Sequence, residues 1–290
     1  MTQDRAITRR TLLAASMLTL AAGCGAGRSS APAAGPTATP TSPPAVMPPT
    51  ARPVTTDPAV LASRATVPVL CWHQLRDWES SDTRYNRRYL ICPPAKFRAQ
   101  LDALVQAGHT TITPDQYLTH LQTGTGLPPK PVLLTFDDGQ ASQMSVGFPE
   151  LQRRRMVGTF FVMTVVLDKR NWMSRRDLRT LDAAGMTVAA HSYDHNQADQ
   201  YSGTDWRTQF DDPRAELSGI IGKPVRHLAY PYGAWDRECF PHVREAGYTT
   251  AFQLSDQPMD PTEPVLTLRR ILVDSYWTGP ELLEAMAEQR

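Results

Sequence analysis

The stretch that decides the fold is Val132-Leu133-Leu134-Thr135-Phe136-Asp137-Asp138-Gly139, an apolar run that ends in two adjacent carboxylates. A buried strand with this ending delivers both carboxylates to one edge of a sheet, where a site can form. Neighbouring strand side chains point to opposite faces, so both can serve one site only if the chain turns, and Gly139 permits that turn. One carboxylate could then bind a cation while the other stays free as a base. An Asx turn that caps a strand is the alternative for this motif taken alone.

A second β-prone run, Thr187-Val188-Ala189-Ala190, ends in His191-Ser192-Tyr193-Asp194-His195. Histidines at this spacing lie on one face of a helix, and a tight loop after a strand brings them together nearly as well. Imidazole is the commonest neutral metal ligand. Two histidines and one carboxylate, each at the end of a strand, make a facial arrangement that leaves positions open for water. The two motifs together therefore indicate a metal site.

A third strand end reads Leu228-Ala229-Tyr230-Pro231-Tyr232-Gly233. Proline fixes φ and glycine allows a sharp turn, so the backbone N–H of Tyr232 could be held pointing into the site. A turn without a catalytic role is the alternative for this segment alone.

With these three segments in this order, residues 66–277 resemble the polysaccharide deacetylases of carbohydrate esterase family 4, the NodB-homology family. The resemblance implies that Asp138, His191 and His195 hold one divalent metal ion, usually zinc, with cobalt or nickel as alternatives. It implies that Asp137 is the general base that takes a proton from the attacking water. It also implies that the Tyr232 N–H stabilises the oxyanion of the tetrahedral intermediate.

Two positions depart from the common family pattern. Many members carry an arginine three residues before the motif tyrosine, where this chain has Ala229, and many carry a late Leu-x-His whose imidazole protonates the departing amine. The corresponding stretch, Leu268–Asp274, contains no histidine. His73, which closes the β-prone run Val67–His73, is the candidate for that acid, an arrangement similar to the poly-N-acetylglucosamine deacetylase subgroup. A histidine that only satisfies backbone groups at a strand end is the alternative.

The predicted function is removal of N-acetyl groups from hexosamine units of an extracellular or cell-wall polysaccharide, with a poly-N-acetylglucosamine-like polymer favoured. A catalytically inactive glycan-binding lipoprotein, or an esterase or amidase acting on another acylated substrate, are the alternatives. Sugar rings stack on aromatic faces, and Tyr230 and Trp277 are the aromatic residues that we expect at the substrate.

The N-terminus resembles a signal peptide over residues 1–23, with a twin-arginine pair, Arg9-Arg10, before a short apolar stretch. Leu20-Ala21-Ala22-Gly23-Cys24 is similar to a lipoprotein cleavage box with Cys24 as the lipidated residue, although Ala21 departs from the usual leucine. Residues 24–60, rich in Pro, Ala and Thr, are predicted to be a disordered tether. We therefore expect an exported membrane lipoprotein that faces the extracellular side or cell wall, with a freely secreted form as the alternative.

Residues 61–290 suit one α/β catalytic domain. Helical periodicity at Pro94–Ala107, 148–155, 174–184 and 206–221 alternates with β-prone runs at 67–73, 110–112, 131–136, 158–163, 187–191, 226–230 and 248–252. This alternation predicts parallel βα units, and the resemblance implies a distorted, incomplete (βα) barrel of about seven parallel strands. A formal net charge of +1 gives no indication of nucleic acid as a partner, and a monomer is expected.

Three cysteines besides Cys24 remain: Cys71, Cys92 and Cys239. A bridge between Cys71 and Cys92 is permitted in an exported protein, and burial as small apolar residues is the alternative.

Overall fold

The computed structural model describes residues 52–254 and 257–288. The predicted signal peptide, Cys24 and most of the predicted tether lie outside these residues. Helix α1, Pro58–Arg64, begins just before the predicted end of the tether, and its Leu61 side chain is buried. Among the helices of the described residues, none combines the length and the hydropathy of a membrane span.

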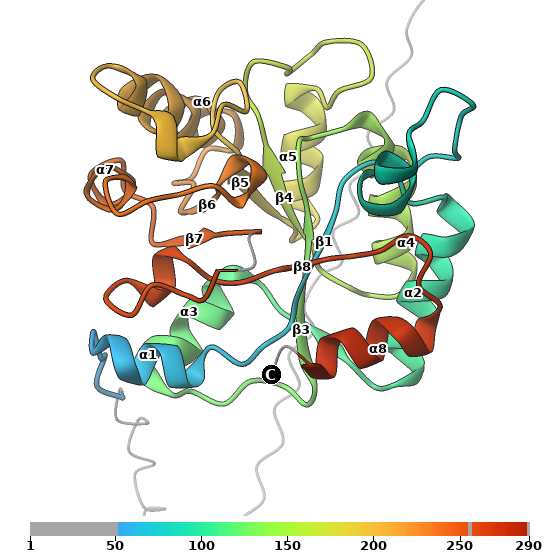
Figure 1. Ribbon diagram of the computed structural model, residues 1–290, viewed down its shortest axis with the longest axis horizontal. Coiled ribbons are helices and arrows are strands. Elements are labelled where there is room, and N and C mark those ends of the chain that lie inside the picture. The colour runs from blue at the N-terminus through green and yellow to red at the C-terminus, as the bar shows by residue number, and fades with distance from the viewer. Residues whose placement is uncertain (1–51, 255–256, 289–290) are drawn as a thin grey trace, which may run out of the picture. The chain divides into compact units, whose positions relative to one another are not determined.

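The sheet of the described residues has a seven-strand path in the order β7-β6-β5-β4-β3-β1-β8, and β2 pairs with β3 beside this path. All of these pairs are parallel. The strands are β1 Val69–Trp72, β2 Thr110–Thr111, β3 Pro131–Phe136, β4 Thr159–Val162, β5 Thr187–Ala190, β6 His227–Ala229, β7 Thr250–Phe252 and β8 Ile271–Leu272. The predicted fold class is thus confirmed: the parallel strands curl into an open half-barrel (Figure 1). All seven predicted runs form strands, and β8 is an additional short one.

The two edges of the sheet approach each other without a continuous ladder. Phe252 at the end of β7 forms a single parallel bridge with Leu268, which lies just before β8. Gln253 N donates to Leu268 O at 2.9 Å, and Leu268 N donates to Ala251 O at 3.0 Å. After this contact the chain continues into β8, which pairs with β1 at the opposite edge of the sheet. The residues just before β8 therefore lie between the two edges of the half-barrel.

Helices lie around the outside of the curved sheet (Figure 1). Besides α1 they are α2 Pro94–Gln106, α3 Pro114–Thr123, α4 Phe148–Arg153, α5 Arg175–Ala183, α6 Asp212–Ile221, α7 Cys239–Glu245 and α8 Gly279–Glu288. The four predicted helices are present, with π-helical turns before α4 and α6. Helical periodicity did not predict α1, α3, α7 or α8. The start of α3 is encoded by a capping box between Thr113 and Gln116, which is a local signal independent of periodicity.

The core is continuous across the strands that carry the motifs. Trp72, Phe136 and Phe160 stack in sequence across β1, β3 and β4, with ring centroids 5.7 Å and 4.9 Å apart. Strands buried on both faces are expected in a parallel sheet that helices cover. Because Trp72 is in register with Phe136, the next residues, His73 and Asp137, leave the sheet side by side. The register therefore brings two predicted site residues together at the carboxyl ends of the strands.

Candidate active site

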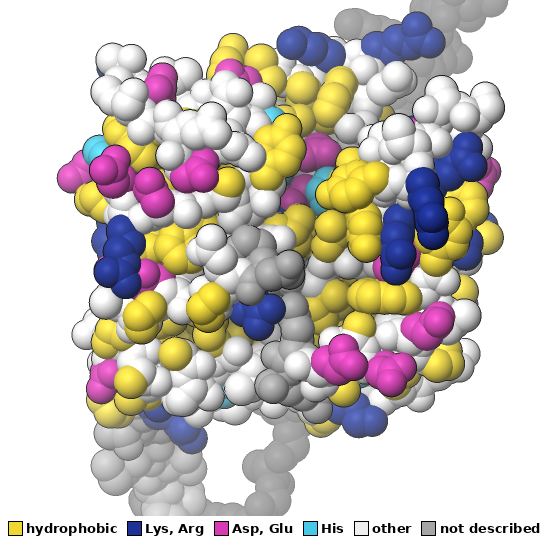
Figure 2. Space-filling model, in the orientation of Figure 1, with side chains coloured by type: hydrophobic (Ala, Val, Ile, Leu, Met, Phe, Trp, Pro, Cys, Tyr) yellow, Lys and Arg dark blue, Asp and Glu magenta, His cyan; other side chains and the backbone are white. Residues whose placement is uncertain are grey.

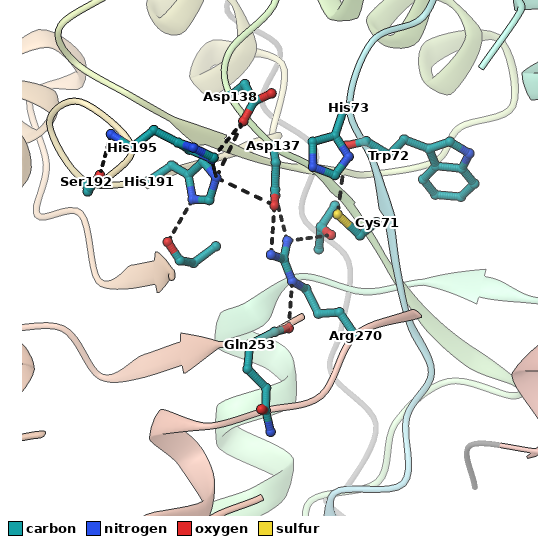
Figure 3. A network of polar contacts seen from close by, with 12 residues as sticks. Cys71, Trp72, His73, Asp137, Asp138, His191, Ser192, His195, Gln253 and Arg270 are labelled. Atoms are coloured by element: carbon teal, nitrogen blue, oxygen red, sulfur yellow. Dashed lines mark hydrogen bonds and ion pairs between the residues drawn. The ribbon is translucent and has the colours of Figure 1, made fainter. Parts of the chain in front are cut away.

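Asp138, His191 and His195 converge at the carboxyl ends of β3 and β5. Asp138 Oδ1 lies 3.6 Å from His191 Nε2 and 3.4 Å from His195 Nε2, and the two Nε2 atoms are 3.2 Å apart (Figure 3). The chain turns sharply at this point, since Asp138 and His195 have positive φ angles of 77° and 70°. The sequence motifs thus place three side chains of metal-binding type, one carboxylate and two imidazoles, around one point.

These three side chains fit a divalent cation. Asp138 Oδ1 is buried and accepts no hydrogen bond from any described residue, so its lone pairs are available to a ligand. His191 Nδ1 is 2.8 Å from the carbonyl oxygen of Ala229, which orients the ring so that Nε2 faces the site. Burial, followed by the charge of His191, lowers the pKa of His195 to about 4, so this imidazole is neutral at pH 7. One carboxylate and two imidazoles are a common donor set for a transition metal.

Asp137 lies between the histidine pair and the guanidinium of Arg270 (Figure 3). Arg270 Nη1 donates to Oδ1 at 2.6 Å and Nη2 to Oδ2 at 2.7 Å, and both side chains are buried. Burial raises the pKa of Asp137, but the charges of Arg270 and His191 outweigh this effect and hold the pKa below its ordinary value. Asp137 is therefore an ionised carboxylate, 3.8 Å from His191 Nε2 and outside the Asp138 triad.

His73 lies on the other side of Asp137 from the two motif histidines (Figure 3). Its Nδ1 is buried and has no hydrogen-bond partner in residues 52–254 and 257–288. His73, Cys71 and Asp137 also place ligand atoms within 4.8 Å of one another. This second group fits a cation poorly, because Arg270 occupies both Asp137 oxygens and burial raises the pKa of the Cys71 thiol. An unpaired imidazole nitrogen beside the pocket suits proton transfer instead.

A buried glutamine joins the two strand ends that carry His73 and Asp137. Gln143 begins a π-helical turn, Gln143–Gly147, and its Nε2 donates to the carbonyl oxygens of both His73 and Asp137. π-helical turns are frequent at functional sites because they redirect side chains. Gln143 thus holds the backbone of β1 and β3 together where the two side chains enter the pocket.

The converging residues line a cavity of about 360 Å³. Figure 2 shows acidic and histidine side chains at the bottom of this hollow, with hydrophobic side chains on both sides. Tyr232 lines it with a positive φ of 58°, and its ring forms a T-shaped contact with the His195 ring, with centroids 4.5 Å apart. The lining residues are His73, Tyr85, Leu90, Asp137, Asp138, His191, His195, Tyr232, Leu254 and Leu272.

The aromatic substrate contacts expected from the sequence are not at this pocket. Tyr230 is fully buried, so its ring has no face available for a sugar, and we correct that assignment. Trp277 packs partly buried against the core and does not belong to the described residues that line the cavity. Cys24 lies outside the described residues.

Sequence reasoning missed Arg270, Gln143 and Tyr85. Arg270 directly precedes β8 in the stretch Leu268–Asp274, and an arginine beside an apolar run was the available signal. Gln143 and Tyr85 carry no motif, and only their neighbours in space identify them. Cys71, Cys92 and Cys239 are free and buried, which decides the open question of their bridging in favour of burial.

Comparison with known proteins finds similarity to one family and to several of its members. The polysaccharide deacetylase family matches residues 124–251, which include the residues from Asp137 to Tyr232 but exclude His73, Tyr85 and Arg270. A Bacillus subtilis protein assigned to the polysaccharide deacetylases, YxkH, is 21% identical over 215 residues, covering 74% of this chain and 74% of that protein. The poly-β-1,6-N-acetyl-D-glucosamine N-deacetylase of Staphylococcus aureus is 21% identical, covering 62% of this chain and 66% of that protein.

A solved structure agrees with the fold. The Streptococcus pyogenes deacetylase PplD in complex with acetate superposes with a TM-score of 0.70 at 20% identity, covering 76% of this chain and 97% of that one. At this identity the likeness concerns the fold alone.

Proposed function

Because this chain belongs to the polysaccharide deacetylase family of hydrolases, we propose that it is a metal-dependent N-deacetylase of an extracellular or cell-wall polysaccharide. The single observation that carries the proposal is the placement of two distinct functional groups within one cavity. Asp138, His191 and His195 form a set of facing ligand atoms, while Asp137 is ionised and separately held by Arg270. A binding protein needs no second carboxylate beside its metal, whereas a hydrolase needs a base there.

Asp138, His191 and His195 would hold the divalent ion, zinc by preference, with cobalt or nickel as alternatives. Such an ion supplies Lewis-acid chemistry, polarising the amide carbonyl and lowering the pKa of water toward roughly 7. Asp137 acts as the general base toward water at the bottom of the cavity, and Arg270 keeps its carboxylate ionised and oriented. Tyr232 lines the same cavity at a turn with positive φ, and in this proposal its N–H stabilises developing negative charge.

His73 completes the proposed reaction as the acid. An amine leaves a tetrahedral intermediate only when it is protonated, so a proton donor must reach the departing nitrogen. His73 lines the same cavity as Asp137 and has a buried ring nitrogen without a protein partner among the described residues. Its position at the end of β1 thereby compensates for the missing late histidine of the family pattern.

A poly-N-acetylglucosamine-like polymer is the substrate that we favour. The S. aureus relative is named for that activity. The position of His73 at the end of the first strand also resembles the arrangement in the poly-N-acetylglucosamine deacetylase subgroup. We also propose that the protein is exported and lipidated at Cys24, on the strength of the N-terminal sequence pattern. Replacement of Cys24 by serine should abolish incorporation of a labelled fatty acid and release the protein from the membrane fraction. Membrane retention of the serine variant would contradict the lipid anchor.

The deciding experiment measures free-amine release by the purified full chain, loaded with zinc or cobalt, from β-1,6- and β-1,4-linked N-acetylglucosamine oligomers. We expect release that a chelator abolishes, with preference for the β-1,6 linkage. The matched variant is Asp137→Asn, which should lose turnover while retaining metal and oligomer binding. Undiminished glycan binding by a wild-type protein that releases no amine would favour the glycan-binding lipoprotein. Release from small acetamides or acetate esters alone would instead favour the amidase or esterase.

A further inference from the structure

One wall of the active-site cavity is built by residues 74–92, which lie between β1 and α2 and outside the range matched by the family. We name this stretch the wall segment. Its two ends are joined, because Gln74 N donates to Leu90 O and Cys92 N donates to Gln74 O, both at 2.9 Å. The wall segment is thus a loop whose two ends are hydrogen-bonded to each other.

The wall segment is also tied to the chain after β8. Arg88 Nε contacts Asp274 Oδ2 at 2.5 Å, and Ser275 N donates to Arg88 O at 2.8 Å. Inside the segment, Trp78 Nε1 donates to Ile91 O at 3.1 Å. These contacts fix the segment at several points, so the side chains that it presents to the cavity are held in place rather than carried on a loose loop.

Tyr85 is the aromatic residue that the wall segment presents to the cavity. Its side chain lines the cavity and is 58% exposed, and its ring contacts the Tyr89 ring at 5.2 Å between centroids. Tyr232, 62% exposed, lines the same cavity from the loop after β6. The strand order places β5, β4 and β3 between β6 and β1, so the two tyrosines flank the reacting groups from different sides.

Exposure combined with a place in the cavity lining distinguishes Tyr85 and Tyr232 from the other exposed hydrophobic side chains of the described residues. The described large hydrophobic side chains that are exposed are Val54, Tyr85, Val105, Tyr193, Tyr232 and Tyr276. Of these, Tyr85 and Tyr232 line the active-site cavity. Exposed aromatic surface beside a cavity is typical of a ligand-binding site, because an aromatic ring offers a large apolar face and little conformational entropy is lost on binding.

We propose that Tyr85 is a substrate-binding residue that packs against the sugar ring next to the unit being deacetylated. The inference rests on the proposed function and deepens it, since it assigns a second sugar position to the site. A pyranose ring has an apolar C–H face that suits an aromatic ring, and the tyrosine hydroxyl can also bond to a sugar hydroxyl. A second sugar position makes the enzyme selective for oligomers over the monosaccharide.

The test compares wild type with Tyr85→Ala, Tyr85→Phe and Val105→Ala on β-1,6-linked N-acetylglucosamine from monomer to hexamer. Val105 is the control, a 48% exposed apolar side chain on α2 that is absent from the described cavity lining. We expect Tyr85→Ala to raise KM for oligomers about fivefold to tenfold with kcat within about twofold, and to leave the monomer unchanged. Tyr85→Phe should restore most of the affinity, and Val105→Ala should match wild type.

A second readout keeps this inference separate from the proposed activity. Oligomer binding to Asp137→Asn, with and without Tyr85→Ala, is measured by titration calorimetry and does not depend on turnover. Weaker hexamer binding in the double variant supports the sugar position even if wild type deacetylates none of these oligomers, in which case the proposed function fails alone. Equal binding, or an equal loss of kcat on every chain length, overturns the role of Tyr85.

Discussion

Arg270 donates two parallel hydrogen bonds to Asp137, at 2.6 Å and 2.7 Å, across a sequence separation of 133 residues. Both side chains are buried, and the position three residues before Tyr232 is Ala229, so this chain has no arginine there. The planar guanidinium matches a carboxylate in a two-bond geometry that lysine cannot reproduce. Arg270 therefore fixes both the orientation and the charge of the proposed base.

Replacing Arg270 should reduce both the stability of the protein and its turnover. We predict that Arg270→Met lowers the free energy of unfolding by about 3–5 kcal/mol, because it leaves an uncompensated buried carboxylate. Arg270→Lys should retain part of the stability but lose most of the turnover, since the two-bond geometry is lost. Urea denaturation and amine release check both. The double variant Arg270→Met/Asp137→Leu should be less destabilised than the sum of its single changes, and strict additivity would contradict the coupling.

Metal binding should depend on each of the three converging ligands. We predict that alanine at Asp138, His191 or His195 lowers zinc affinity by at least about 100-fold, because only two protein ligands then remain to hold the ion. Calorimetric titration of zinc into the metal-stripped protein measures this. Asp137→Asn is the control and should still bind one equivalent. If it loses the metal as well, Asp137 is a ligand and not a separate base.

His73 should matter for turnover and not for metal. We predict that His73→Gln lowers kcat by about 10²- to 10⁴-fold, the usual contribution of a positioned acid. Metal content, measured by mass spectrometry of the digested protein, should stay at one per chain. His120→Gln, which replaces a half-buried histidine on α3, is the matched control. Full turnover in His73→Ala would show that His73 is not the acid.

The wall segment should loosen in acid. Asp82 accepts hydrogen bonds from Arg76 at 2.7 Å and 2.9 Å, and these, with the Glu79 N–H, lower its pKa from 3.8 to about 2. Because the folded pKa lies below the unfolded one, this stabilisation is complete above pH 3.8 and disappears as the pH falls toward 2. Hydrogen-exchange protection factors of residues 76–90 should therefore fall selectively between pH 5 and pH 2.5.

Asp82→Asn is the control for that prediction. It should reduce protection of the wall segment already at pH 5 and remove the selective loss in acid. An unchanged acid response in this variant would assign the effect to another group.

The three described cysteines should be unreactive in the native protein. Burial raises the pKa of Cys92 and of Cys239 to about 12, and Cys71 is buried beneath the site. We predict no alkylation of these thiols by iodoacetamide at pH 8 and complete alkylation after denaturation in urea. Peptide mapping identifies each site. A peptide linking Cys71 to Cys92 would contradict the free thiols.

The sequence by itself determined the parallel βα architecture and the cluster of Asp137, Asp138, His191 and His195. Both depend on local signals, because apolar runs define strands and polar residues at their carboxyl ends must meet at one edge of a parallel sheet. It also indicated His73, whose proximity to Asp137 follows from the pairing of Trp72 with Phe136.

Only the tertiary structure decided which distant side chains complete the site. Arg270 contacts Asp137 because the chain passes from β7 to β8, which lies beside β1 at the other edge of the sheet. No local sequence pattern encodes where such a connection ends. The same long-range packing buries Tyr230 and exposes Tyr85 at the cavity, although residue type is the same at both positions. Residue type and spacing specify where a strand ends, whereas burial and partners depend on what the rest of the chain packs against that end.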